Sequence, residues 1–158
     1  MLTFTSCGYR LAGKKLNSGA GQTIAVPTFA NSTTTYRLEQ RLSEAVRREL
    51  IRRTKFHVVS DLAGDVVVAG EVVGFSAVPI IFNQQGRGTS YSILVDVSVS
   101  LTDTKTGTVL FQNDRWTFRE VFELSQNSAE YISEDTAAMD RLARRFASSL
   151  VALMLHSK

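Results

Sequence analysis

The sequence contains little of the chemistry from which most enzyme sites are built. Its 158 residues include one cysteine, Cys7, and two histidines, His57 and His156. A single cysteine excludes an intramolecular disulfide, and the C-x-x-C and H-E-x-x-H spacings of transition-metal sites are missing. His57 falls in a short predicted strand and His156 lies near the end of the chain, so structural or solvated roles suit both better than catalysis. We therefore expect no enzyme, no metal site and no cofactor.

Signals for nucleotides, nucleic acids and membrane spans are missing as well. The triplets 19–21 and 86–88 are bare G-x-G patterns without the remaining glycines or the Lys-Ser/Thr of a phosphate loop. No run approaches the ~18 apolar residues of a membrane span. The net charge of +3 is small and dispersed, whereas nucleic-acid-binding proteins usually concentrate positive charge. We expect no nucleic-acid partner.

The composition predicts one ordinary globular domain. Apolar residues make up 44% of the chain and charged residues 21%, and the length suits a single domain. Residues 8–21 are rich in Gly, Ser and Lys, which indicates a tether. We therefore predict an N-terminal segment over 1–21 and a single domain over 22–158. Thirteen of the eighteen basic residues are Arg, which suits bidentate binding of carboxylate or phosphate.

The stretch Thr89–Leu101 is the clearest structural signal. Apolar positions from Tyr91 to Leu101 alternate with mostly polar positions from Ser92 to Thr102. A period of two indicates a strand with one apolar face, as found in antiparallel sheets covered on one side only. At about 3.3 Å per residue this strand would be roughly 36 Å long. We expect helices on its apolar face and an open polar face.

Two amphipathic helices are predicted to supply that covering layer. The first spans 36–53, with apolar residues recurring at three- and four-residue steps and with Glu–Arg pairs four residues apart. The second spans about 128–155. The predicted apolar positions are Leu38, Leu42, Ala45, Val46 and Leu50 in the first helix, and Ile132, Met139, Leu142, Phe146, Leu150 and Leu153 in the second.

Short strands complete the predicted fold. Strands over 23–26 and 56–59 flank the first helix, which predicts a parallel crossover. A third strand over 66–75 has possible bulges at Gly70 and Gly74, and a connection over 79–88 leads to the long strand. The element order β-α-β-β-β-β-α predicts an α/β (α+β) two-layer sandwich, with both helices on one face of a mixed sheet.

The register of the hairpin after the long strand can be predicted in detail. Lys105-Thr106-Gly107 fits a three-residue turn with Gly in the left-handed position, which sets Leu101 opposite Phe111. Farther along, the apolar residues shift from odd-numbered positions (Val109, Phe111) to even-numbered positions (Trp116, Phe118). We therefore predict one extra residue, a β-bulge, near 113–115. The expected pairs beyond the bulge are Val97 with Trp116 and Val95 with Phe118, and Arg115 and Arg119 then lie on the polar face.

Three segments together resemble a known family. Cys7-Gly8-Tyr9-Arg10-Leu11-Ala12-Gly13 is similar to the start of a mature bacterial lipoprotein. With the segment 23–31 and the strand running from Tyr91 into Asp103-Thr104-Lys105-Thr106-Gly107, the chain resembles the lipopolysaccharide-assembly lipoprotein family LptE from Cys7 to about Leu153. Two features depart from the pattern: the six residues before Cys7 are too few for a signal-peptide h-region, so the chain as given could not be exported or lipidated, and Phe4-Thr5-Ser6 is a loose lipobox.

The resemblance implies a non-enzymatic protein of the outer membrane, held at its periplasmic face by a lipid on Cys7. Its implied partners are a large β-barrel, LptD, which such proteins plug, and lipopolysaccharide, whose assembly they assist. Because Arg pairs bidentately with phosphate, the lipopolysaccharide-binding candidates are Arg87, Arg115 and Arg119, with Lys105 behind them. The barrel-contact candidates are Ile80, Ile81 and Phe82.

Other interpretations of these residues stay open. Each basic candidate could be a solvated surface charge, and residues 80–82 could extend their strand into the core instead of contacting a partner. In the alternative interpretation, the chain is a periplasmic envelope lipoprotein, and it acts as an adaptor domain in a secretion or translocation complex. Co-purification with a single large barrel favours the first function, and assembly into a ring favours the alternative.

Overall fold

The computed structural model describes residues 10–11, 21–123 and 128–156. The elements in chain order are β1 (Arg10–Leu11), β2 (Thr23–Ala25), β3 (Ala30–Asn31), α1 (Leu38–Arg53), β4 (His57–Val59), β5 (Val66–Phe82), β6 (Gly88–Asp103), β7 (Val109–Glu123) and α2 (Ser128–His156). The predicted order is confirmed, with the two short strands β1 and β3 added. Cys7 lies outside the described residues, and the domain division at 21/22 stays a prediction.

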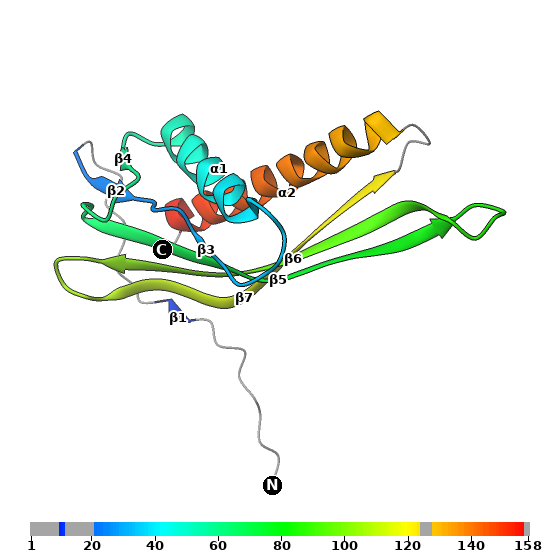
Figure 1. Cartoon of the computed structure of the whole chain (residues 1–158). Coiled ribbons are helices and arrows are strands. Elements are labelled where there is room, and N and C mark those ends of the chain that lie inside the picture. The colour runs from blue at the N-terminus through cyan, green and yellow to red at the C-terminus, as the bar shows by residue number, and fades with distance from the viewer. Residues whose placement is uncertain (1–9, 12–20, 124–127, 157–158) are drawn as a thin grey trace, which may run out of the picture.

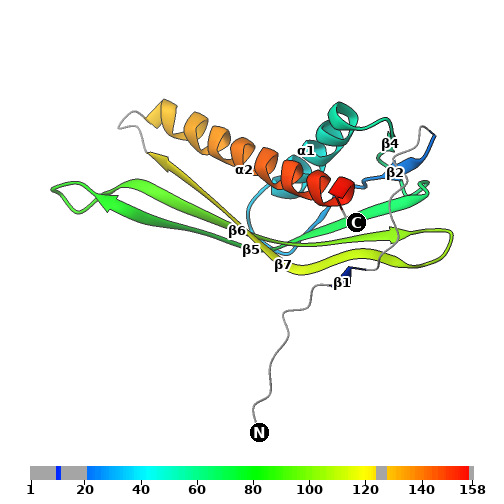
Figure 2. The same cartoon turned by 180° about the vertical axis from the view of Figure 1, so that it is seen from behind.

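The strands form one mixed sheet, and both helices cover the same face of it (Figure 1). The strand order is β1-β7-β6-β5-β2-β4, and β3 pairs with β5 beside β2. Strands β2, β3 and β4 make only parallel pairs, whereas β5, β6, β7 and β1 follow one another in antiparallel pairs. In both views α1 and α2 lie above the sheet, and no helix lies on its lower side (Figures 1 and 2). The predicted two-layer sandwich is therefore confirmed.

The alternation predicted for the long strand is present in β6. Ile93, Val95, Val97, Val99 and Leu101 are at most 1% exposed and lie in the core under the helices. The residues that alternate with them are mostly half-buried on the open face. The strand has 16 residues, a little longer than predicted.

The predicted register between β6 and β7 is confirmed, bulge included. Gly107 has φ 67°, the left-handed conformation that the turn requires. Leu101 pairs with Phe111, and the register shifts between Val97 and Val99. Beyond this shift Val97 pairs with Trp116 and Val95 with Phe118. The extra residue keeps both aromatic rings on the helix side, where Trp116 and Phe118 each contact Phe146 of α2.

Strand β5 differs from its prediction. It continues seven residues beyond Phe75, so residues 79–82 belong to a strand and the connection to β6 is only 83–87. Gly74 follows a bulge, as predicted, whereas Gly70 pairs regularly with Val99. Gly70 is needed for close packing instead, because a Cβ there would lie 2.6 Å from Cδ2 of Phe29.

Helix α1 begins at Leu38, two residues later than predicted. The Asn31 side chain holds the preceding loop: its Nδ2 donates to the carbonyl of Thr35 and to Glu39, and its Oδ1 accepts the N–H of Thr33. Arg37, the residue before the helix, has a left-handed backbone with φ 60°, so the helical conformation does not extend to an earlier start.

The predicted apolar stripes of the helices are largely confirmed. The five predicted apolar positions of α1 are all buried. In α2, Met139, Leu142, Phe146 and Leu150 are buried, whereas Leu153 is 38% exposed. The side chain of Ile132 lies outside the described part.

Candidate functional site

The far end of the β5–β6 hairpin carries a cluster of solvent-exposed apolar side chains. Val78, Ile80, Ile81 and Phe82 are 45, 40, 54 and 57% exposed. Both views show this hairpin projecting beyond the N-terminal end of α2 (Figures 1 and 2). Residues 80–82 therefore extend their strand, but away from the core and not into it. Apolar clusters exposed in this way are typical of surfaces that bind a partner.

The backbone edge of β7 and the backbone edge of β5 differ in how much of each is hydrogen-bonded. Along β7, β1 pairs with residues 111–112, and the carbonyls of Arg119 and Val121 accept hydrogen bonds from Arg145 and Arg141 of α2. Along β5, β3 pairing ends at Val72, and no strand of the described residues pairs with that edge from 73 to 82. Unprotected edges can bind another chain. The open edge and the apolar surface thus coincide on the hairpin.

Two of the predicted basic residues lie together on the open face of the sheet. Arg119 pairs with Leu94 in the register, and its Nε donates to Ser92 Oγ at 2.8 Å. Arg115 Nε lies 3.7 Å from Asp96 Oδ2. Among the described residues no carboxylate pairs with Arg119, so its charge is available to an anion, whereas the charge of Arg115 is partly balanced.

The other two basic candidates lie at opposite ends of β6. Arg87 is exposed in the turn at the hairpin tip, and its guanidinium has no ion-pair partner among the residues described. Lys105 lies beyond the other end, with its Nζ 2.7 Å from Asp65 Oδ1. The hydrogen bond from Lys105 lowers the pKa of Asp65 and raises that of Lys105. Leu94, which pairs with Arg119, is seven positions from Arg87, about 23 Å along a strand. The four candidates therefore do not form one cluster.

A charged cluster joins β7 to α2 beside the hairpin. Glu120 faces the helices, with its carboxylate 2.9 Å from Arg141 Nε and 3.0 Å from Arg145 Nη1. Burial raises the pKa of Glu120, but the hydrogen bonds and charges of the two arginines outweigh it, and the pKa lies below its usual value. This cluster holds α2 against β7 where the hairpin leaves the covered part of the sheet.

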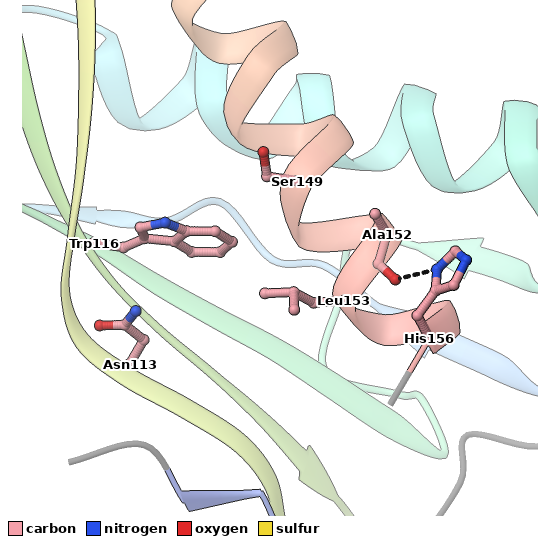
Figure 3. Close-up of a pocket in the computed structure, with 6 residues that line it drawn as sticks. All are labelled: Asn113, Trp116, Ser149, Ala152, Leu153 and His156. Atoms are coloured by element: carbon pink, nitrogen blue, oxygen red, sulfur yellow. Dashed lines mark hydrogen bonds between the residues drawn. The ribbon is translucent and has the colours of Figure 1, made fainter. Parts of the chain in front are cut away.

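A hollow of about 420 Å³ opens between β7 and the last turns of α2. Its lining residues are Asn113, Trp116, Ser149, Ala152, Leu153 and His156. The indole of Trp116 and the Leu153 side chain face each other across it, and the Asn113 amide lies at its lower side (Figure 3). His156 Nδ1 contacts the carbonyl of Ala152 at 2.8 Å. No lysine, arginine or carboxylate lines the hollow among the residues described.

No group of three or more His, Cys, Asp or Glu residues is placed to hold a metal ion among the residues described. Within the same residues, no helix has both the length and the apolar character of a membrane span.

The sequence profile of the lipopolysaccharide-assembly family LptE matches residues 21–154 of the chain. The chain belongs to the LptE family. The match includes every element from β2 to β7 and most of α2. The predicted family is thus confirmed, and the chain is a member of a family of lipopolysaccharide-assembly lipoproteins. No curated protein matches the sequence.

Solved structures share the fold of this LptE-family chain at low sequence identity. Rare lipoprotein B from Shewanella oneidensis has a TM-score of 0.59 and 13% identity, with 84% of this chain and 92% of that chain covered. A lipoprotein from Caulobacter crescentus also has a TM-score of 0.59 at 13% identity, covering 81% and 88%. The PelC dodecamer from Paraburkholderia phytofirmans has a TM-score of 0.52 at 18% identity, covering 87% and 96%.

Two features of this LptE-family chain were not among the predictions from its sequence. The hollow could not be predicted, because Leu153 belongs to an apolar helical stripe and carries no sign that the stripe leaves the core there. The Glu120 cluster left a weak signal. Arg141 and Arg145 are four residues apart on α2, and Glu120 interrupts the apolar pattern of β7 on the helix side.

Proposed function

We propose that this protein is a non-enzymatic outer-membrane lipoprotein that plugs an LptD-like β-barrel and assists lipopolysaccharide transport and assembly. The family match across residues 21–154 carries the proposal. In this proposal Cys7 bears the lipid that holds the domain at the periplasmic face of the outer membrane. The domain itself performs no reaction: it presents surfaces to the barrel and to lipopolysaccharide.

The hairpin supports the barrel contact. Ile81 and Phe82 are more than half exposed at the far end of a long two-stranded arm. An arm of this kind reaches a partner at a distance from the helices, and its apolar residues would be desolvated on contact. Fully desolvated anchors of this type usually contribute most of the binding free energy of an interface.

The arginines support binding of an anionic lipid. The guanidinium groups of Arg87 and Arg119, which have no carboxylate partner among the described residues, suit lipid phosphates, since Arg binds phosphate bidentately. Arg115 lies on the same face as Arg119 but also contacts Asp96. We therefore rank Arg87 and Arg119 ahead of Arg115, and Lys105 last because it is paired with Asp65.

The barrel contact can be tested by co-purification. In the exported full-length protein, the double variant Ile81→Asp and Phe82→Asp should lose a co-purifying large barrel. The matched control is Ile51→Asp with Leu62→Asp, since Ile51 and Leu62 are 64 and 70% exposed but lie away from the hairpin. Barrel recovery that is equal in both double variants would remove the hairpin tip from the interface.

Lipopolysaccharide binding can be tested by charge reversal. Changing Arg87, Arg115 and Arg119 together to Glu should weaken capture of lipopolysaccharide in a pull-down without unfolding the domain. The control with the same change in charge reverses three exposed arginines of the helices, Arg48, Arg52 and Arg144. An equal loss of captured lipopolysaccharide in both triple variants would show a general effect of charge. No loss in either variant would exclude Arg87, Arg115 and Arg119 from the binding site.

Anchoring through Cys7 is tested separately. In a full-length exported form, Cys7→Ala should abolish membrane association when the barrel is absent. If the variant still fractionates with the outer membrane, Cys7 is not the anchor.

An adaptor role in a secretion or translocation complex is the second candidate. The observation that favours it is the fold shared with PelC, a protein solved as a dodecamer. The mass of the purified assembly separates the two functions: a one-to-one complex with a barrel supports the first, and a ring of many copies supports the second.

A further inference from the structure

We infer that the hollow between β7 and the end of α2 binds one acyl chain, and that this chain is the lipid carried by Cys7. The inference rests on the proposed function, which makes Cys7 the lipidated residue. It assigns the hollow to the protein's own anchor and not to the lipopolysaccharide that the protein handles.

The lining of the hollow fits an acyl chain. Trp116, Ala152 and Leu153 provide an apolar wall on two sides (Figure 3). The volume of about 420 Å³ lies in the lower part of the usual range for ligand pockets. The described lining has no lysine, arginine or carboxylate to pair with a phosphate or an ammonium, and its polar residues are Asn113, Ser149 and His156. An uncharged, flexible, apolar ligand is the one that this surface would desolvate favourably.

One polar group of the lining points to a carbonyl in the ligand. Asn113 is 9% exposed, and its Oδ1 accepts the N–H of Arg115. Its Nδ2 has no hydrogen-bond partner among the described residues, and the amide lies at the hollow (Figure 3). A ligand that buries this amide N–H without accepting a hydrogen bond from it would lose binding free energy. The ester or amide carbonyl that begins an acyl chain would accept from this Nδ2, which a plain hydrocarbon could not do.

The path of the chain identifies the source of the lipid. Strand β1 pairs antiparallel with β7, with Arg10 opposite Gln112 and Leu11 opposite Phe111. The chain therefore enters β1 from the side of Asn113, the next residue of β7 and part of the hollow. Cys7 precedes Arg10 by three residues, a span of at most about 11 Å. A lipid on Cys7 thus starts within reach of the hollow.

The sequence contains the two probes that a test needs. Trp116 is the only tryptophan of the chain, and Cys7 is the only cysteine. Intrinsic fluorescence therefore reports the hollow, and a thiol-reactive label goes to Cys7 alone. A long brominated acyl chain coupled to Cys7 of the full-length unlipidated protein quenches tryptophan only near contact.

We expect this label to quench Trp116 independently of protein concentration. Ala152→Phe, which fills the hollow, should abolish the quenching, while Ser148→Phe on the exposed side of the same helix should leave it unchanged. Leu153→Asp provides a second blocking variant at a half-exposed position, should Ala152→Phe prevent folding. As a positional control, the same label on Gln85→Cys in a Cys7→Ser background lies at the hairpin tip and should not quench.

Three results would overturn the inference. The first is an absence of quenching by the Cys7-linked chain. The second is quenching that survives both blocking variants. The third is quenching by free dibromostearate but not by the linked chain, which would leave an acyl site with a different source of lipid. Because the label is attached chemically, these results do not depend on the barrel or on lipidation in the cell. Failure of the proposed function would appear instead in the co-purification and fractionation experiments.

Discussion

Replacing Glu120 by Gln tests how strongly the charged cluster holds α2 against β7. Glu120 is 12% exposed at its side chain and binds Arg141 and Arg145 at 2.9 and 3.0 Å. Gln has nearly the same shape and keeps a carbonyl acceptor, but it removes the negative charge. The change therefore isolates the electrostatic part of the contact.

The expected loss can be worked out from these contacts. Hydrogen bonds to charged groups contribute about 1.5–3 kcal/mol each. Arg141 and Arg145 are 44 and 65% exposed at their side chains, so solvent screening reduces each contribution to about 0.5–1 kcal/mol. Since Gln retains one acceptor, we expect Glu120→Gln to lower the free energy of unfolding by about 1 kcal/mol at neutral pH.

The pH dependence supplies an independent check. The pKa of Glu120 is lowered in the folded protein. Its contribution to the free energy of unfolding is therefore complete above the unfolded pKa of about 4.3, and is lost as the pH falls through the folded value. Gln resembles the protonated carboxyl group. The difference in unfolding free energy between wild type and variant should therefore shrink as the pH falls from about 6 to about 3.

Urea unfolding followed by Trp116 fluorescence measures both quantities. The control is Glu44→Gln, because Glu44 and Arg48 are 57 and 68% exposed and 3.7 Å apart. That variant should lose no more than about 0.5 kcal/mol. If Glu120→Gln is as stable as the control, or if its deficit stays constant down to about pH 3, the reasoning about this cluster is refuted.

Three further variants test the packing. Phe146→Ala should lower the free energy of unfolding by about 3–5 kcal/mol, because Phe146 is fully buried and its ring contacts Phe29, and a loss below about 1 kcal/mol in urea unfolding would contradict this. Gly70→Ala should lower the free energy of unfolding by about 1–3 kcal/mol, because the added Cβ clashes with Phe29. Phe29→Leu should restore part of that loss. Strictly additive effects of the two changes in a double-mutant cycle would exclude the clash. Ile81→Asp with Phe82→Asp should change the thermal midpoint little, since surface changes usually stay within about 0.5 kcal/mol each, and a large drop would show that the tip packs in the fold.

Periodicity explains which parts of the fold could be predicted. Apolar residues alternate without interruption from Tyr91 to Leu101, so the strand, its buried face and the need for a helical layer all followed from the sequence. The parity change between Phe111 and Trp116 was enough to predict the bulge, because one extra residue is the simplest local change that keeps both rings on one face.

The parts that could not be predicted depend on partners distant in sequence. The third strand is predicted to end at Phe75, yet β5 continues because β6 pairs with it up to Phe82. Gly70 looked like a bulge position, but its role depends on Phe29, forty-one residues earlier in the chain. Helix α1 starts after Arg37, whose left-handed backbone no capping pattern in the sequence indicates.

The candidate site shows the same division. Its residue types could be read directly from the chain: arginines on the open face, an apolar segment at 80–82, one cysteine near the start and one tryptophan in the last strand. Their arrangement came from long-range packing, because spacing along one strand does not show which charges are already paired by distant carboxylates. That packing placed Lys105 beside Asp65, left Arg119 without a carboxylate among the described residues, and formed a hollow where the end of α2 passes over Trp116. Such a hollow depends on how one helix packs across one strand, and no local pattern of residues contains that information.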